Sequence, residues 1–138
     1  MKVNFQLIEN YALNCENRHI DLHNNFNFIH FEFNIETMTL VLKWVKSASD
    51  WVQEDELPHF TLLHKNVSYL TVSPRDPEMP LSEDSCLSNV TFFPSSSRDI
   101  SDCIFDKSFP NEDDDILYMF QSGQVIRVHC EEIELITV

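Results

Sequence analysis

Residues 26–45 alternate apolar and polar side chains over most of their length, and this pattern constrains the fold more than any other feature of the chain. A period of two is typical of half-buried strands. The apolar side chains that follow it are Ile29, Phe31, Phe33, Met38, Leu40, Leu42 and Trp44. If the chain reverses at Ile35-Glu36, Phe33 opposes Met38 and one face of the resulting hairpin is wholly apolar.

A second hairpin is predicted over residues 116–129. The segments Ile116–Gln121 and Gln124–His129 flank Ser122-Gly123, and Gly123 is the only glycine in the chain. Glycine accepts a positive φ without a Cβ clash, as tight hairpin turns require. A two-residue turn at Ser122-Gly123 predicts Phe120 opposite Val125 and Met119 opposite Ile126.

The remaining segments give weaker signals. Short strands are predicted at Phe60–Lys65, Val67–Val72, Val90–Phe93 and Ile100–Phe105, with a reversal near Lys65-Asn66. Residues 73–85 form a proline-punctuated loop that could end in one helical turn capped by Ser82. No segment shows a helical period over about 12 residues, and residues 8–20 are the best remaining helix candidate.

These patterns predict a single domain covering residues 1–138. We expect a mainly β fold, or an α+β fold with a minor helix. About seven or eight strands form an antiparallel sheet, arranged as a sandwich or a half-open barrel.

The charge balance limits the classes of partner. The chain has 23 Asp and Glu against 9 Lys and Arg, a formal net charge of −14. Phosphate backbones and anionic membranes are bound by clustered cations, so we expect neither a nucleic acid nor a membrane as partner. The single glycine also excludes P-loops and dinucleotide fingerprints.

The N-terminal segment and the cysteines indicate a compartment. Asn4, Gln6 and Glu9 interrupt the apolar run that a secretory signal needs, and no stretch approaches the length of a membrane-spanning helix. The four cysteines show no CxxC pair, so we interpret them as reduced thiols. The expected location is cytoplasmic.

Catalytic and metal motifs are absent from the sequence. His19 and His23 have the spacing of one helical face, but no convincing helix or second ligand pair accompanies them. No glycine-rich nucleophile elbow is present. We therefore expect no metal, no cofactor and no enzymatic activity, although acid–base pairs among the 23 carboxylates stay open.

Five runs of acidic residues exceed the net charge of about 2–8 that keeps a small domain soluble. Each run alone could be a solvated loop. Together they predict fast, steered association with a basic protein. Trp51, in a polar loop with acids downstream, could be an interface anchor or could fold back to plug the end of the sheet. The candidate partner-binding residues are Trp51, Glu54, Asp55, Glu56, Glu112, Asp113, Asp114, Asp115, Glu131, Glu132 and Glu134.

The chain resembles the small acidic immunity proteins that bacteria make against their own delivered toxins. The segments compared are Trp51–Glu54, Pro74–Glu78 and Tyr118–Arg127, which together cover less than a third of the chain. The resemblance implies a cytosolic protein without cofactors that blocks a basic toxin domain, often a nuclease. It transfers no individual functional residue.

The leading hypothesis is therefore a non-catalytic protein that neutralises a cationic partner, most simply a toxin domain. The alternatives are a nucleic-acid mimic that inhibits a DNA-binding protein, a small hydrolase-like enzyme, and a subunit of a larger assembly. The oligomeric state is left open.

Overall fold

The computed structural model describes all 138 residues, in twelve strands and two short 3₁₀ helices, η1 (Leu81–Ser85) and η2 (Ser95–Ser97). The strands are β1 (Lys2–Val3), β2 (Gln6–Ile8), β3 (Ala12–Cys15), β4 (Arg18–Asp21), β5 (Phe26–Asn34), β6 (Thr39–Lys46), β7 (His59–Lys65), β8 (Tyr69–Ser73), β9 (Leu87–Pro94), β10 (Asp114–Phe120), β11 (Val125–His129) and β12 (Glu132–Ile136). The predicted fold class is confirmed. The structure has more strands than predicted because residues 2–21, where no strand was expected, form the short strands β1 to β4.

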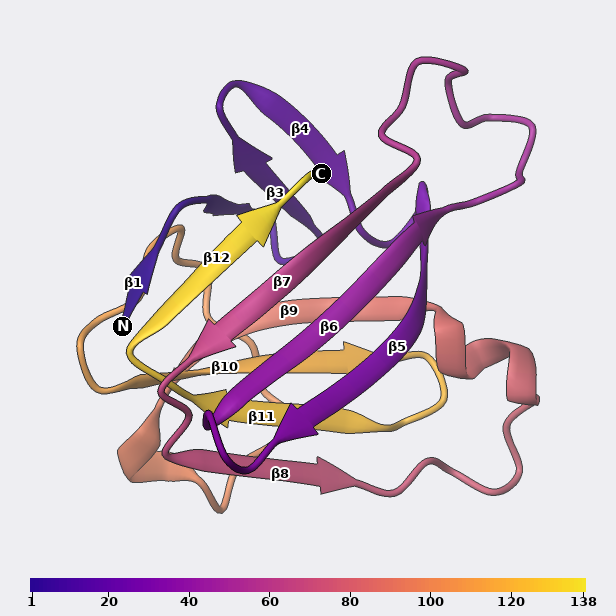
Figure 1. Cartoon of the computed structure of the whole chain (residues 1–138). Helices are drawn as coiled ribbons and strands as arrows, with labels where there is room; N and C mark the ends of the chain where they lie inside the picture. The colour runs from indigo at the N-terminus through magenta and orange to yellow at the C-terminus, as the bar shows by residue number, and fades with distance from the viewer.

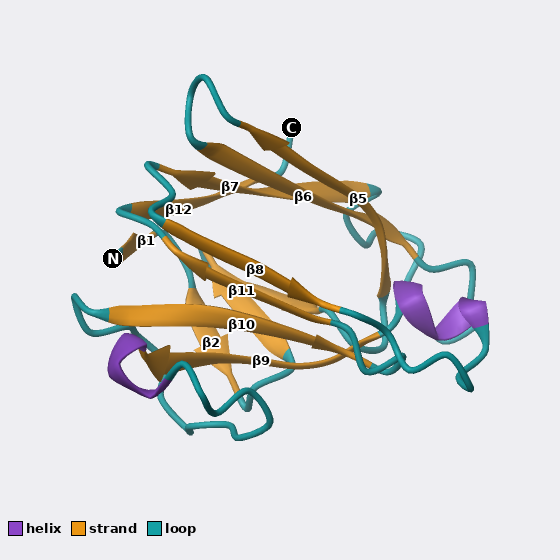
Figure 2. Ribbon diagram, turned by 90° about the horizontal axis from the view of Figure 1, so that it is seen from below, coloured by secondary structure: helices purple, strands orange, loops and turns teal.

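Three sheets share the strands (Figure 1). The five-stranded sheet has the order β1-β12-β7-β6-β5, the four-stranded sheet β8-β11-β10-β9, and the three-stranded sheet β2-β3-β4. Every pairing is antiparallel except that of β1 with β12. The five-stranded and four-stranded sheets lie one above the other as an open sandwich (Figure 2). Neither helix is long and apolar enough to span a membrane.

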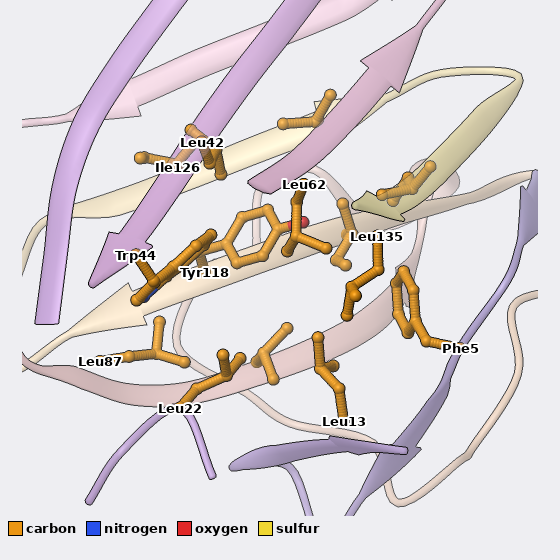
Figure 3. Packing of buried hydrophobic residues seen from close by; sticks show 14 of the residues in the cluster. Phe5, Leu13, Leu22, Leu42, Trp44, Leu62, Leu87, Tyr118, Ile126 and Leu135 are labelled. Atoms are coloured by element: carbon orange, nitrogen blue, oxygen red, sulfur yellow. The ribbon is translucent and has the colours of Figure 1, made fainter. Parts of the chain in front are cut away.

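The main core lies between the two larger sheets (Figure 3). Alternate residues of β6 and β7 point into it, and Trp44 stacks on Phe60 with ring centroids 5.3 Å apart. From the opposite sheet, the buried Tyr118 hydroxyl donates to Nε2 of His64 at 2.8 Å. Burying each such aromatic ring contributes on the order of 1.5–3 kcal/mol. Leu40, Leu42 and Trp44, which the alternation in the sequence placed on the apolar face, are all fully buried. The sequence pattern therefore identified the inward face of β6.

The first hairpin has a longer turn than predicted. Phe33 pairs with Leu40, not Met38, and the chain reverses over residues 35–38. The side chain of Asn34 accepts hydrogen bonds from the backbone N–H groups of Glu36 and Thr37, and Met38 takes a positive φ of 52°. This local geometry displaces the register by two residues, which keeps Phe31 and Phe33 on the apolar face. Ile29, predicted on the same face, lies at a bulge and is 60% exposed.

The second hairpin also has a longer turn than predicted. Met119, rather than Phe120, pairs with Val125. Gly123 is confirmed at a positive φ of 86°, but it is the last residue of a three-residue loop, Gln121–Gly123. The Gly123 N–H donates to the Phe120 carbonyl at 3.0 Å. Glycine in this position is typical of a three-residue hairpin loop, which shifts the register by one.

Two predictions about secondary structure were wrong, and one was confirmed in part. Residues 8–20 form no helix, because positive-φ turns at Glu9-Asn10 and Glu16-Asn17 fold them into β2, β3 and β4. Residues 100–105 form no strand. The helical turn near Ser82 exists as η1, although no side chain caps it.

The predicted reversal near Lys65-Asn66 also exists, but it does not make a hairpin. Asn66 has a positive φ of 54°, and β7 and β8 belong to different sheets. The chain therefore crosses from one layer of the sandwich to the other at this point.

Candidate functional site

The longest segment without helix or strand is residues 98–113, between η2 and β10, which we call the acidic loop. Its exposed carboxylates belong to Asp99, Asp102, Asp106, Glu112 and Asp113. Its exposed large apolar side chains are Ile100, Ile104, Phe105 and Phe109. Long irregular segments in compact domains are usually functional or disordered. The contacts that hold the acidic loop to the sheets indicate which of the two applies.

The acidic loop is attached along the edge of β9. The Phe105 carbonyl accepts hydrogen bonds from the side chains of Asn10 and Thr91, at 2.9 and 3.2 Å. The Phe105 ring stacks on Phe93, with centroids 4.7 Å apart. Further along, the N–H of Leu7 in β2 donates to the Ser108 carbonyl at 3.0 Å. These side-chain contacts replace the strand pairing that the sequence pattern predicted here.

A group of charged side chains, which we call the buried charge cluster, lies under both ends of this loop. Its members are Arg98, Lys107, Asp114, Asp115 and Arg127. Asp115 is fully buried at the start of β10 and accepts hydrogen bonds from Arg98 at 2.9 Å and from Arg127 at 2.7 Å. Asp114 is also buried and pairs with Lys107.

The cluster also fixes the loop backbone. The guanidinium of Arg127 donates to the carbonyls of Ile100, at 2.7 Å, and Pro94, at 3.1 Å. Arg98 lies over the Tyr69 ring, 3.6 Å from its centroid. At the far end, the N–H of Asn111 donates to the Asp114 carboxylate at 2.8 Å. The first and last turns of the loop are therefore held by charge-assisted hydrogen bonds.

Asp115 is ionised in this environment. Burial alone would raise the pKa of its carboxyl, but hydrogen bonds from Arg98 and Arg127 outweigh burial and lower the pKa below its ordinary value. The same contact raises the pKa of Arg98. Nδ1 of His129 lies 3.0 Å from the Asp114 carbonyl, to which it donates, and 3.2 Å from the Asp115 carboxylate. At the centre of the cluster, Asp115 is thus a carboxylate held between the side chains of Arg98 and Arg127.

The structure divides the predicted run Glu112–Asp115 in two. Glu112 and Asp113 are exposed, as a partner-binding surface requires. Asp114 and Asp115 are 1% and 0% exposed, so their predicted place on the surface is wrong. They begin β10, where both side chains are buried and the three cations pair with them.

The predicted residues Glu131, Glu132 and Glu134 lie at or near the same end of the molecule. The N-terminal amine of Met1 contacts the Glu112 carbonyl at 3.3 Å, and the N–H of Lys2 donates to the Glu131 carbonyl at 2.8 Å. Two of the three acids are already paired on β12: Lys65 bridges Glu132 at 2.9 Å and Glu134 at 2.7 Å. Glu131 stays exposed and is connected to Glu112 through these contacts of Met1 and Lys2.

Trp51 and Glu54–Glu56 lie elsewhere, on the loop of residues 47–58 at the opposite end of β7 (Figure 1). Trp51 is 65% exposed, so it does not plug the sheet. Its indole N–H donates to the Asn24 carbonyl at 2.9 Å, which fixes the ring in place. Glu56 is half-buried near Arg18, while Glu54 and Asp55 are exposed.

The sequence-based prediction missed the cations of the cluster and the apolar side chains of the acidic loop. The signal for the cations was present in the second hairpin. Asp115 and Arg127 both face away from the main core, at diagonal positions on neighbouring strands. A buried arginine within an apolar strand needs a counter-charge, and Asp115 was the available one.

No activated nucleophile is visible where a cysteine meets a histidine. The Cys86 sulfur is 4.0 Å from Nδ1 of His23, but that nitrogen is 2.6 Å from the Leu87 carbonyl and so donates to it. Burial raises the pKa of the Cys86 thiol above its ordinary value. This is the reverse of the lowered pKa that a nucleophilic cysteine requires. No group of three or more His, Cys, Asp or Glu side chains is arranged to hold a metal ion.

The geometry presents a surface of acids and apolar side chains on a loop that is held from beneath. Comparison of the chain with protein-family models, curated proteins and solved structures finds no match.

Proposed function

We propose that the protein is a non-catalytic binding protein that neutralises a cationic partner protein, as an immunity protein blocks a nuclease-type toxin domain. The acidic loop and the adjacent Glu131 form the contact surface. The observation that carries this proposal is the orientation of charge in the loop. Its acids point outward, while Arg98 and Lys107 turn inward to Asp115 and Asp114.

The distribution of cations over the whole molecule supports the proposal. Six of the nine Lys and Arg side chains are paired with carboxylates, and only Lys2, Lys43 and Lys46 lack an acidic partner. The buried charge cluster holds three cations and two carboxylates, so the rest of the chain carries a formal charge of −15. A negative surface of this strength speeds association with a positive protein and repels other acidic proteins.

The exposed apolar side chains of the acidic loop provide affinity, which surface charge alone does not. Interface hot spots combine aromatic anchors with charged surroundings, because apolar burial gives affinity and charge gives rate and specificity. Phe109, which lies between Asp106 and Glu112 in the chain, is 59% exposed, and Phe105, next to Asp106, is 42% exposed. The hydrogen bonds to Arg127 and Thr91 hold the loop in one conformation before binding, which lowers the entropy cost of association.

The experiment uses the full chain and the purified product of the gene that lies next to its own, tested by biolayer interferometry over a series of salt concentrations. Lysozyme and a commercial basic ribonuclease serve as basic proteins of unrelated origin. We expect tight binding to the neighbouring product alone. The reversal Glu112→Lys/Asp113→Lys should slow association about tenfold and flatten its salt dependence.

A matched variant, Glu36→Lys/Glu78→Lys, makes the same change in net charge at exposed residues outside the acidic loop. It should slow association much less, because screening weakens charges beyond about 10 Å at 0.1 M salt. If the two variants slow association equally, the net charge of the chain would explain the binding, and the acidic loop would not be the contact surface. The proposal fails if no basic protein binds at low salt.

A further inference from the structure

The outer edge of β5 is open. This strand pairs only with β6 and forms one border of the five-stranded sheet (Figures 1 and 2). No backbone hydrogen bond outside the sheets involves residues 26–34. The outward N–H and C=O groups of residues 30–34 are therefore available to another strand.

The other edges of the two larger sheets are shorter or partly covered. Along β9, the Val90 N–H donates to the Asn10 carbonyl at 2.8 Å, and the Asn10 side chain donates to the Val90 carbonyl at 3.0 Å. β8 has five residues and is followed by Pro74, and β1 has only two residues. β5 has nine residues and contains no proline, lysine or arginine, the residues that commonly block edge pairing.

Apolar side chains gather on the same hairpin. Ile29 is 60% exposed, Phe31 38%, Ile35 77% and Met38 41%. Phe31 pairs with the fully buried Leu42 and so lies on the core-facing side of the sheet, but at its uncovered border. A free edge bordered by apolar side chains is a site for strand addition rather than a solvated surface.

We propose that β5 pairs in antiparallel fashion with β5 of a second copy of this chain, centred on Phe31. The strand is self-complementary in this register. Phe31 faces Phe31 of the second copy across the two-fold axis, and His30 faces Glu32 of the second copy on the opposite side of the sheet. Within one chain, His30 and Glu32 already lie on one side, with Nε2 and Oε2 3.1 Å apart.

A second copy fits this edge better than an unrelated partner. Aromatic pairs and pairs of complementary polar side chains are cross-strand contacts that stabilise antiparallel sheets, and in this register the His30–Glu32 pair forms twice, once on each side of the two-fold axis. An isologous contact of this kind closes after two chains and does not propagate into fibres. It joins two five-stranded sheets into one continuous sheet.

The pairing is independent of the proposed partner binding. The acidic loop covers the outer face of the four-stranded sheet, whereas β5 borders the other sheet (Figure 2). Two chains of formal charge −14 repel each other, so salt should strengthen the dimer by screening. Binding of a cationic partner should instead weaken with salt, so the two associations can be separated in one salt series.

The test is sedimentation velocity of the full chain from 5 to 500 μM, in 0.05, 0.15 and 0.5 M NaCl. We expect a monomer–dimer equilibrium that shifts toward the dimer as salt rises. Phe31→Lys should weaken dimerisation at least tenfold, because it places two cations opposite each other at the centre of the pairing. His30→Glu should weaken it as well, by placing two carboxylates opposite each other on each side of the axis.

The swap His30→Glu/Glu32→His restores both His–Glu pairs and should recover dimerisation, which no general loss of stability would do. Val72→Lys is the matched control at the other uncovered edge, on β8, and should leave the equilibrium unchanged. Thermal melts of each variant check folding. The proposal is overturned if the wild type stays monomeric at 500 μM, if Val72→Lys is the disrupting variant, or if the swap does not recover what His30→Glu loses.

Discussion

The acidic loop and the loop of residues 47–58 have similar compositions and are built in different ways. Each carries an acidic run and exposed aromatic or apolar side chains. The acidic loop is held by the buried charge cluster, whose central carboxylate, Asp115, is fully buried. The loop of residues 47–58 is held by exposed and part-buried contacts, such as Trp51 with the Asn24 carbonyl and Asn25 with the Glu56 carboxylate, and none of them involves a fully buried charge.

The difference shows that an acidic run can have two physical roles. Glu54 and Asp55 contribute only surface charge, whereas half of the run Glu112–Asp115 is structural. Burying charge is costly unless each group is paired. The cluster therefore gives the acidic loop one defined conformation, and it removes three cations from the face that the loop presents. The predictions below test this contrast, beginning with the largest expected effect.

Asp115→Asn should lower the free energy of unfolding by about 3–5 kcal/mol, because it leaves Arg127, whose side chain is 3% exposed, without a counter-charge. Urea denaturation measures the loss. Glu54→Gln, at the exposed run, should change it by less than about 0.5 kcal/mol. A loss below 1 kcal/mol for Asp115→Asn would mean that water replaces the carboxylate, and that the two loops do not differ as described.

The pH dependence of stability should separate the cluster from the core histidine. Burial is the main cause that lowers the pKa of His64, from 6.5 to about 4. The unfolded chain therefore takes up a proton first, and stability should fall by about 3 kcal/mol as pH drops from about 6.5 to 4.

Asp115 has a lowered pKa and acts in the opposite sense: its contribution is complete above the ordinary Asp pKa and is lost only as pH falls through its own lower value. His64→Gln should flatten the curve above pH 4 and leave the steeper acid limb. Urea midpoints measured at half-unit steps of pH check this. A curve that keeps its slope between pH 6.5 and 4 in the variant would assign that slope to another group.

Lys107→Met should act mainly on the acidic loop. It removes the cation beside the buried Asp114, one of whose oxygens already lacks a hydrogen-bond partner. We expect a loss of about 1–3 kcal/mol. In hydrogen exchange, faster exchange should be confined to residues 104–112 and their neighbours in β2. Uniformly faster exchange would show that the loop unfolds only with the whole domain.

The sequence predicted much of the sandwich and little of the site. Alternation identified the buried face of β6, and the lone glycine identified the second turn, because both signals are local. The registers of the two hairpins were predicted wrongly because both turns were taken as two residues long. The turn that follows Asn34 and the turn that begins at Gln121 are both longer. The cluster could not be predicted from runs of like charge, because Asp115 meets Arg98 and Arg127 only after β9, β10 and β11 have paired.

The smallest effect is expected at Trp51, and fluorescence makes it measurable. The chain has two tryptophans, of which Trp44 is fully buried and Trp51 is 65% exposed. Trp51→Phe loses one hydrogen bond from a partly exposed indole, so the free energy of unfolding should fall by no more than about 1 kcal/mol. The remaining emission, from Trp44 alone, should shift to shorter wavelength. If emission instead moves to longer wavelength, Trp51 is the shielded ring. The loop of residues 47–58 would then be packed like the acidic loop, which would remove the contrast between them.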